Sequence, residues 1–312
     1  MASIDRIKHY IKHPNRIYAF FANRGFFNFM PDDKYLKMAY KLKTGNKLNL
    51  ENPKTFNEKV QWMKINCRDP FLTQLVDKYG VREYIREKLG EDYIVPMCGG
   101  PWKSVDEIDI DALPERFVLK CTHDSGGLCI CPNKAEFDFE KAKKIINKSL
   151  KREYFWTGRE WPYKNVEPRI IAEEFLDDFE PGEEGFGGGL TDYKFHVFNG
   201  KSKFFSVGKG LEKHFGKRIS FYDMDGNEMP FKRKDYKGFD VKPKFPDNMA
   251  ELIKTAEKLA ADIPAPFVRV DLYSIKNRIY FSEATFFPCG GAIPFDPPEW
   301  DGILGDWIDL EK

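Results

Sequence analysis

No stretch of the 312 residues is apolar over the length that a membrane-spanning helix requires, and the N-terminus lacks the apolar run of a secretory signal. Fifty basic residues are balanced by forty-nine acidic ones, so the chain has no overall field that would select nucleic acid as a partner. The composition, 42% hydrophobic and 32% charged, is that of a folded globular protein. These features predict a globular protein of the cytoplasm that binds no nucleic acid.

Two common site signatures are also missing. Cys129 and Cys131 are two residues apart, but no second cysteine pair matches them, so the six cysteines predict reduced thiols rather than a zinc site. The chain has no Gly-x-x-x-x-Gly-Lys-Ser/Thr motif, the common phosphate loop of nucleotide-binding proteins. A nucleotide site in this chain must therefore be built from other residues.

The length allows two or three small domains, and the patterns along the chain indicate four regions. Residues 1–50 form a basic arm rich in aromatic residues, and residues 51–112 predict a small α/β domain. Within that domain we expect one helix from about Pro70 to Leu89, ended by Gly90. Residues 113–175 and 176–312 both mix strands with helices, so the predicted fold class is α+β.

The arm of residues 1–50 carries ten basic and three acidic residues, a net charge of +7, whereas the rest of the chain carries −6. Aromatic residues are interleaved with this charge, namely Tyr18, Phe20, Phe21, Phe26, Phe27 and Phe29. Such an arm suits an acidic polymer or a peripheral contact with an anionic membrane, at its inner face. The simpler interpretation is a pair of helices whose aromatic face packs on the body of the protein.

The most informative segment is a predicted hairpin near the C-terminus, formed by FVRVDLY and RIYFSEATFF. Because side chains alternate along a strand, Arg269 and Asp271 share one face. Glu283 and Thr285 share a face of the return strand by the same rule. A three-residue turn over residues 276–278 would place Asp271 opposite Glu283. Arg269 would then lie opposite Thr285.

Two carboxylates that face each other across a strand pair repel each other and destabilise the pair. A cation between Asp271 and Glu283 would explain the arrangement, and ligands that are all oxygen favour Mg²⁺ or Mn²⁺. The planar fork of Arg269 beside them suits phosphate oxygens. The alternative is a surface hairpin with scattered charges, which the apolar residues of both strands disfavour.

Two further segments are typical of nucleotide binding. In FVLKCTHDSGG, Lys120 ends an apolar strand ahead of the loop Ser125-Gly126-Gly127, where glycines allow backbone N–H groups to approach phosphate oxygens. In AEEFL, the end of a strand at Glu173–Leu176 offers backbone groups to the edge of an adenine and apolar side chains to its ring. Taken alone, the first segment is better explained as an ordinary glycine-rich hairpin tip, and the second is equally consistent with an edge strand that carries an exposed glutamate.

The order of these segments along the chain strengthens the prediction of a nucleotide site. LPERFVLKCTHDSGG, DKYGVREYI, RIIAEEFL, DYKFHVFNGK, FVRVDLY and IYFSEATFFPCGG, followed by EWDGILGDWI, resemble the TupA-like ATP-grasp family of the teichuronopeptide-biosynthesis type. The resemblance runs from about residue 50 to the C-terminus and implies two α+β lobes that close on ATP. Residues 113–175 would be the lobe with the phosphate loop, and residues 176–312 the metal-binding lobe. The family also implies a link to the synthesis of capsules and other cell-surface polysaccharides.

The resemblance further implies ATP and Mg²⁺ as cofactors. The expected site residues are Lys120, Ser125, Gly126 and Gly127 for the phosphates; Glu173, Glu174, Phe175 and Leu176 for adenine; Asp271, Glu283 and Thr285 for the metal; and Arg269 and Lys194 for catalysis. The wider ATP-grasp pattern has Glu-x-Asn where this chain has Glu283-Ala284-Thr285. This departure leaves open whether one metal ion or two are bound.

These expectations converge on an ATP-dependent carboxylate–amine ligase that acts through an acyl phosphate. Its substrates would be an amine or amino acid and a uronic acid of a surface glycan or glycan precursor. One alternative is a glycosyltransferase of polysaccharide synthesis, for which Asp223-Met224-Asp225 is the nearest metal motif, although Asp225-Gly226 is better explained as a turn. A second alternative is a non-catalytic glycan-binding protein.

Overall fold

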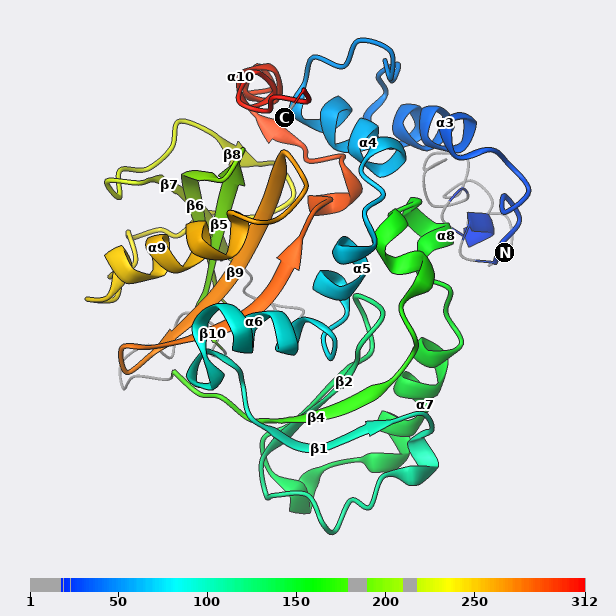
Figure 1. The fold of residues 1–312 in the computed structure, drawn as a ribbon, viewed down its shortest axis with the longest axis vertical. Coiled ribbons are helices and arrows are strands. Elements are labelled where there is room, and N and C mark those ends of the chain that lie inside the picture. The colour runs from blue at the N-terminus through cyan, green and yellow to red at the C-terminus, as the bar shows by residue number, and fades with distance from the viewer. Residues whose placement is uncertain (1–17, 19, 23, 179–189, 210–217, 312) are drawn as a thin grey trace, which may run out of the picture.

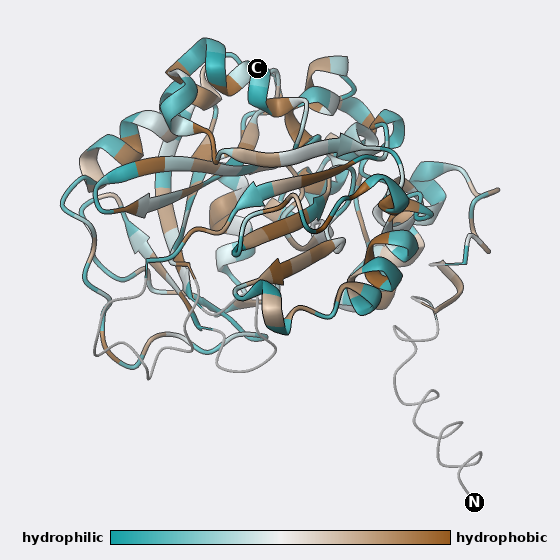
Figure 2. Cartoon of the chain, turned by 90° about the horizontal axis from the view of Figure 1, so that it is seen from below, coloured by the Kyte–Doolittle hydropathy of each residue, from teal (hydrophilic) through white to brown (hydrophobic). Residues whose placement is uncertain are grey.

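The computed structural model describes residues 18, 20–22, 24–178, 190–209 and 218–311. Within these residues the chain forms two antiparallel sheets with helices packed around them, and a short two-stranded ribbon (Figure 1). The helices show hydrophilic and hydrophobic residues on different sides in Figure 2, as helices that cover a core do. Residues 1–17 of the predicted arm lie outside the described part of the chain.

The first sheet has four strands in the order β1–β4–β2–β3. Their bounds are Met97–Trp102 for β1, Phe117–Cys121 for β2, Leu128–Cys131 for β3 and Ile170–Glu174 for β4. Because side chains alternate along β2, Phe117, Leu119 and Cys121 are buried on one face, where they share a core with α7 (Phe139–Leu150). Val118 and Lys120 are carried on the opposite face of the strand.

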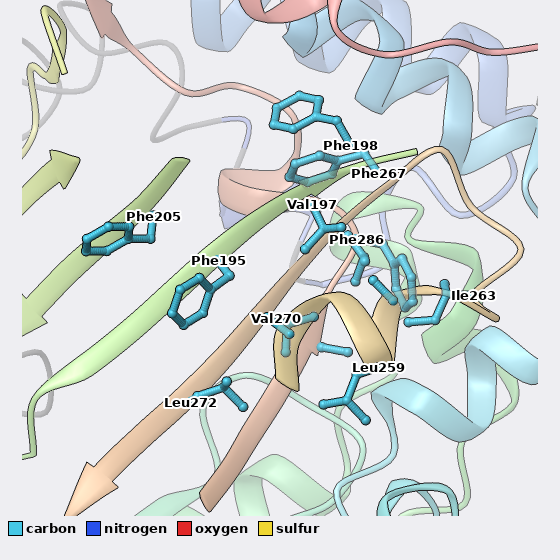
Figure 3. Close-up of a cluster of buried hydrophobic side chains, with 14 of the residues drawn as sticks. Phe195, Val197, Phe198, Phe205, Leu259, Ile263, Phe267, Val270, Leu272 and Phe286 are labelled. Atoms are coloured by element: carbon cyan, nitrogen blue, oxygen red, sulfur yellow. The ribbon is translucent and has the colours of Figure 1, made fainter. Parts of the chain in front are cut away.

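The second sheet has five strands in the order β10–β9–β5–β6–β7. Their bounds are Asp192–Phe198 for β5, Lys201–Lys209 for β6, Arg218–Asp223 for β7, Phe267–Ile275 for β9 and Arg278–Thr285 for β10. Figure 3 shows part of the hydrophobic core on this sheet, to which Phe195 of β5, Leu272 of β9 and Leu259 of α9 (Met249–Ala260) all contribute. The cluster accounts for much of the unusually large number of phenylalanines, 28 in the sequence.

Several short elements complete the fold. The ribbon pairs β8 (Lys232–Arg233) with β11 (Phe295–Asp296), and α8 (Phe155–Gly158) and α10 (Trp300–Asp306) are short helices. The 3₁₀ turns are η1 (Glu91–Tyr93), η2 (Val105–Glu107), η3 (Lys134–Glu136), η4 (Trp161–Asn165) and η6 (Pro288–Gly290). None of the helices in the described part of the chain combines the length and the apolar character that a bilayer crossing needs.

Residues 51–112, expected as a domain of their own, are shared between the two sheets. Helix α4 (Phe56–Asn66) begins with a capping box, in which the Thr55 hydroxyl accepts the N–H of Glu58 and the Glu58 carboxylate accepts the N–H of Thr55. The apolar faces of α4, α5 (Pro70–Val76) and α6 (Val81–Leu89) belong to the same core as the five-stranded sheet. Strand β1, in contrast, is an edge strand of the four-stranded sheet.

The helix expected from Pro70 to Leu89 is two helices, α5 (Pro70–Val76) and α6 (Val81–Leu89), so that expectation was wrong. At the break the Asp77 carboxylate accepts the backbone N–H of Tyr79 at 3.0 Å, a local bond that competes with the helical pattern. The backbone N–H of Lys78 donates to the carbonyl of Thr122 at 3.1 Å. The break therefore joins this segment to the glycine loop between β2 and β3.

The described part of the arm packs on the body through Arg159, which is only 2% exposed to solvent. The guanidinium donates to the carbonyl of Phe27 at 2.8 Å and pairs with Asp32 at 3.1 Å, at the start of α3 (Asp32–Thr44). The Tyr35 hydroxyl adds a bond of 2.9 Å to the carbonyl of Thr157. These bonds hold α3 and the turn before it against α8.

Candidate functional site

A cavity of about 660 Å³ has walls from both sheets and from α6. Every residue expected to bind the nucleotide contributes to its lining: Lys120, Ser125, Gly126, Gly127, Glu173, Glu174, Phe175 and Leu176. From the other sheet Glu283 also lines it. The structure thus brings three segments that are far apart in the sequence to one place.

The walls of the cavity are apolar in some places and charged in others. Its apolar lining comes from side chains of both sheets and of the segments beside them: Val95, Val118, Ile130, Phe175, Leu176 and Phe281. Its charged lining includes Lys78, Lys120 and Glu283. Apolar walls with a few convergent charged groups are what a cofactor pocket of this size requires.

Lys120 is held in an ion pair across the four-stranded sheet. Its ammonium lies 2.5 Å from Glu173, whose other carboxylate oxygen is 3.2 Å from the guanidinium of Arg82. The side chain of Glu173 is 8% exposed, so its charge depends on these two cations. Because Lys120 and Glu173 both line the cavity, this pair lies in its wall.

The glycine loop is shaped by Asp124, which the sequence argument did not single out. One carboxylate oxygen accepts the N–H groups of Gly126 at 3.3 Å and Gly127 at 3.1 Å, and the other accepts the Ser149 hydroxyl from the end of α7. Both glycine N–H groups, which were expected to face phosphate oxygens, therefore already have a carboxylate acceptor. The loop is preorganised by an internal anion.

Lys78 is a further residue that sequence reasoning missed. It lines the cavity, and its ammonium donates to the carbonyl of Asp124. Burial lowers the pKa of Lys78, while the nearby carboxylates of Glu283 and Asp124 raise it. The signal that could have found it is Asp77-Lys78-Tyr79-Gly80, a polar stretch with a glycine inside an apparent helix.

The register of the β9–β10 hairpin places Asp271 opposite Glu283 and Arg269 opposite Thr285, as expected. The expected three-residue turn was wrong. The turn has two residues, Lys276 and Asn277, with φ of 50° and 61°, which is the left-handed pattern of a tight hairpin turn. An irregularity between Phe281 and Glu283 supplies the offset of one residue that the shorter turn removed.

The charged side chains of β9, β5 and β10 form one cluster beside the cavity. Arg269 binds Asp271 through two bonds, of 2.6 and 2.7 Å, and reaches Glu283 at 2.9 Å. Lys194 of β5 lies opposite Asp271 and contacts it at 2.6 Å, and it also pairs with Asp192. The repulsion that a divalent cation was expected to relieve is relieved here by Arg269 and Lys194.

The two carboxylates of this cluster differ in environment. Burial raises the pKa of Asp271 to about 6, although Arg269 and Lys194 act to lower it. Burial acts in the same sense on Glu283, but the combined field of Arg269, Lys194 and Lys78 lowers the pKa of this carboxyl to about 2. Glu283 is therefore ionised at neutral pH, and its side chain remains 44% exposed toward the cavity.

Within the described ranges, no three His, Cys, Asp or Glu side chains are grouped so as to hold a metal ion. Both oxygens of Asp271 already accept N–H groups, and the Thr285 hydroxyl accepts from Arg269 at 3.0 Å and donates to Glu283 at 3.1 Å. Mg²⁺ takes most of its ligands from phosphates and water and needs only one or two carboxylates. The donor set fits an ion that arrives with a nucleotide, with Glu283 as the accessible ligand.

The alternative metal motif at Asp223-Met224-Asp225 is a turn. The carboxylate of Asp223 accepts the backbone N–H of Asp225 at 3.0 Å and that of Asn227 at 2.8 Å, and it also accepts the Asn227 amide at 3.0 Å. These bonds are those of a side chain that closes a turn on its own backbone.

A family model described as TupA-like ATP-grasp matches residues 58–309, which is most of the chain. The chain belongs to the TupA-like ATP-grasp family. It therefore has the ATP-grasp fold, mixed α+β. The comparison with curated proteins found no match.

Solved structures of ATP-grasp enzymes are similar to this chain, at low sequence identity. D-alanine–D-alanine ligase from Bacillus anthracis, complexed with ATP, is 13% identical with a TM-score of 0.39, over 69% of this chain and 56% of that one. N5-carboxyaminoimidazole synthetase from Staphylococcus aureus, complexed with ADP, is 15% identical with a TM-score of 0.39, over 74% and 52%. The chain thus spans little more than half the length of these proteins.

Proposed function

We propose that this TupA-like ATP-grasp protein is an ATP-dependent carboxylate–amine ligase, with ATP bound in the 660 Å³ cavity. The observation that carries the proposal is the position of Glu283. Its carboxylate lines the cavity together with Lys78 and Lys120, and it also accepts a hydrogen bond from Arg269 in the charged cluster. A nucleotide in the cavity with its triphosphate toward Glu283 would bring the terminal phosphate to Arg269.

In this proposal the adenine lies against the apolar wall, where the backbone of Glu173–Leu176 reads its edge. Lys120 and Lys78 supply point charges to the phosphates, and the loop of Ser125, Gly126 and Gly127 covers them. Since Asp124 already accepts the N–H groups of Gly126 and Gly127, the lysines carry more of the phosphate binding than the loop. Closure of the loop over the phosphates would exclude water from the reacting atoms.

The reaction needs charge neutralisation rather than a dedicated acid or base. A substrate carboxylate oxygen attacks the γ-phosphorus, ADP leaves, and an amine then attacks the acyl carbon and displaces phosphate to form the amide. Arg269 is held by Asp271, and its Nη2 also donates to Glu283 and Thr285, a position from which the guanidinium can meet the transferred phosphoryl group. Lys194, fixed between Asp192 and Asp271, would steady the acyl phosphate.

Mg²⁺ bound with the nucleotide would neutralise charge that develops on the phosphoryl oxygens. Glu283 would hold the ion from the cavity side, with Asp271 as the second carboxylate and Thr285 as a weaker oxygen donor. For Asp271 to take part, one of its bonds to Arg269 or Lys194 must be exchanged for the ion. Mn²⁺ suits the same oxygen donors.

The proposed substrates are a uronic acid of a cell-surface polysaccharide, or its precursor, and an amino acid or other amine. This part of the proposal is supported by the family, whose teichuronopeptide-biosynthesis type the sequence resembles. The bonds of Asp223 within its own turn argue against the glycosyltransferase alternative. Synthesis of such precursors would place the enzyme in the cytoplasm, near the inner face of the membrane.

The first experiment is thermal stabilisation by nucleotides. Mg-ATP is expected to raise the melting temperature of the wild type, whereas nucleotide-sugars are expected to leave it unchanged. Asp271→Asn serves as the site control. A shift with nucleotide-sugars and none with Mg-ATP would favour the glycosyltransferase instead.

The second experiment is a screen for ATP consumption, in which amino acids are tested against uronic-acid glycosides. Release of ADP and phosphate only when both a carboxylate and an amine are present is the expected result. Release of ADP and phosphate that needs neither substrate, or that needs no carboxylate substrate, would contradict a ligase. Glu283→Gln tests whether the observed turnover belongs to this site.

A further inference from the structure

Four phenylalanines of the arm are exposed in the structure. Phe20 is 46% exposed, Phe21 39%, Phe26 62% and Phe29 80%, and we call these four residues the aromatic patch. Half of the large hydrophobic side chains that are exposed in the described residues belong to it. None of the four lines the nucleotide cavity. Removing a phenylalanine side chain from water is strongly favourable in free energy. A cluster of exposed phenylalanines therefore indicates an interaction surface.

Three rings of the patch, those of Phe20, Phe21 and Phe26, contact one another and continue into a buried layer. Phe21 lies 5.4 Å from Phe20 and 5.3 Å from Phe26, measured between ring centroids. Phe26 contacts Phe27 at 5.5 Å, and Phe27 in turn packs on Tyr18 at 5.8 Å. Phe27 packs against the buried cluster that includes Tyr18, while the patch lies outside it. The aromatic face of the arm is therefore only partly used in packing on the body.

The patch is presented by a fixed piece of backbone. Arg159, buried beneath the arm, donates to the carbonyl of Phe27 at 2.8 Å and to that of Met30 at 3.4 Å. It also pairs with Asp32 at 3.1 Å and stacks on the ring of Tyr35 at 4.5 Å. The turn that carries Phe26 and Phe29 is thus tied to the body at its base. A turn whose backbone is already fixed loses less conformational entropy on binding than a flexible one.

Positive charge accompanies the patch. The guanidinium of Arg24 lies 3.5 Å above the ring of Phe20. In the adjoining α3, Lys34, Lys37 and Lys41 are exposed. The first fifty residues carry a net charge of +7, against −6 for the remainder. Exposed phenylalanines in a strongly basic segment match the chemistry of an anionic lipid surface, whose headgroups attract the cations and whose acyl boundary accepts the rings.

We propose that the aromatic patch and the basic residues of the arm form a peripheral membrane-binding surface for anionic phospholipid. The rings enter the boundary between headgroups and acyl chains, and Arg24 and the α3 lysines remain among the headgroup phosphates. The membrane holds the protein from one side, and no helix crosses it within the part of the chain described here. This surface is separate from the proposed ligase activity and does not depend on it.

The test is sedimentation of the full-length chain with vesicles. Phosphatidylcholine vesicles with phosphatidylserine at about one third of the lipid are compared with vesicles of phosphatidylcholine alone, at low and at high salt. The wild type is expected to pellet with the anionic vesicles at low salt, and to pellet weakly in the other conditions. In the double variant Phe26→Ser, Phe29→Ser the partition coefficient is expected to fall about tenfold or more.

Val241→Ser is the matched control, since Val241 is an exposed apolar side chain on the body, 70% exposed. It is expected to bind vesicles as the wild type does. A melting temperature equal to that of the wild type shows that the double variant is folded. The proposal is overturned if the wild type does not pellet with anionic vesicles, or if the double variant pellets equally well. It is also overturned if the double variant abolishes a concentration-dependent dimer while vesicle binding is absent, because the patch then joins two copies of the chain.

Discussion

Arg269 and Asp271 are joined by two parallel bonds, Nε to Oδ1 at 2.6 Å and Nη2 to Oδ2 at 2.7 Å, although they lie on the same strand. Burial of Asp271, which is fully inaccessible to solvent, makes this pair costly to break. The same Nη2 that donates to Asp271 also reaches Glu283 at 2.9 Å on the neighbouring strand. The pair therefore fixes the direction in which Arg269 meets anything bound in the cavity.

Replacement of Arg269 by Lys keeps a cation but removes the fork. Because an ammonium cannot form two parallel bonds to Asp271 and also reach Glu283, we expect ATP-dependent turnover to fall about 100-fold or more. Turnover is measured as ADP release with the substrates that the screen identifies. Arg278→Lys, on the same hairpin but 50% exposed at its side chain, should retain activity. Equal activity of both variants would contradict a role for the fork.

Lys78→Met tests the lysine at the helix break. Since burial lowers the pKa of Lys78, its charge is unfavourable in the folded protein, and Met should leave the melting temperature without nucleotide nearly unchanged. The affinity for Mg-ATP is expected to fall about tenfold or more, because a charge-assisted contact to phosphate is lost. Isothermal titration measures the affinity. Lys144→Met, at an exposed position of α7, should bind Mg-ATP as the wild type does.

Two neighbouring glycines of the loop are expected to respond differently to alanine. A Cβ at position 127 would meet Ser149 Oγ at 2.3 Å and Cys121 Cβ at 2.6 Å, so Gly127→Ala should destabilise the protein by about 1–3 kcal/mol. A Cβ at position 126 would meet no atom closer than 3.7 Å, so Gly126→Ala should have a small effect. Urea unfolding of both variants checks the difference. A loss of similar size in both would mean that backbone freedom, not packing, decides.

Glu283→Gln is expected to change how stability depends on pH. The pKa of Glu283 is about 2 in the folded protein, below the ordinary value of 4.5, so its stabilising contribution is present above pH 4.5 and is lost as the pH falls toward 2. Allowing for solvent screening of the exposed part of this side chain, the variant should be less stable at neutral pH by about 1 kcal/mol. This difference should shrink at about pH 3. Glu299→Gln, at an exposed position, is the control for urea unfolding at both pH values.

The sequence was informative where the two-residue alternation of side chains along a strand determines which face each residue occupies. The period of two along FVRVDLY and IYFSEAT, combined with an expected three-residue turn, predicted that Asp271 faces Glu283 and that Arg269 faces Thr285, and both pairings are present. The same pattern did not identify the turn. Two residues at positive φ and a compensating irregularity give the same register as three turn residues. Alternation reports which face a residue occupies, not how many residues a loop contains.

Helical periodicity was less reliable between Pro70 and Leu89. The apolar residues on both sides of the break suit one helix, and the local bond from Tyr79 to the Asp77 carboxylate is a weak signal in the sequence. The position of Lys78 in the cavity depends on that break. Asp124 was missed for a similar reason, since its role depends on Ser149, which lies 25 residues further along the chain.

By itself the sequence determined the family, the α+β class and the faces on which the charged residues of each strand lie. These follow from motifs and from local periodicity, which need no long-range contact. Only the tertiary structure decided that Arg269 and Lys194 neutralise Asp271, that Asp124 occupies the N–H groups of the glycine loop, and that Lys78 joins the cavity. Each of these depends on atoms from segments distant in sequence, because a buried charge pairs with whichever opposite charge the packing of the chain brings within reach.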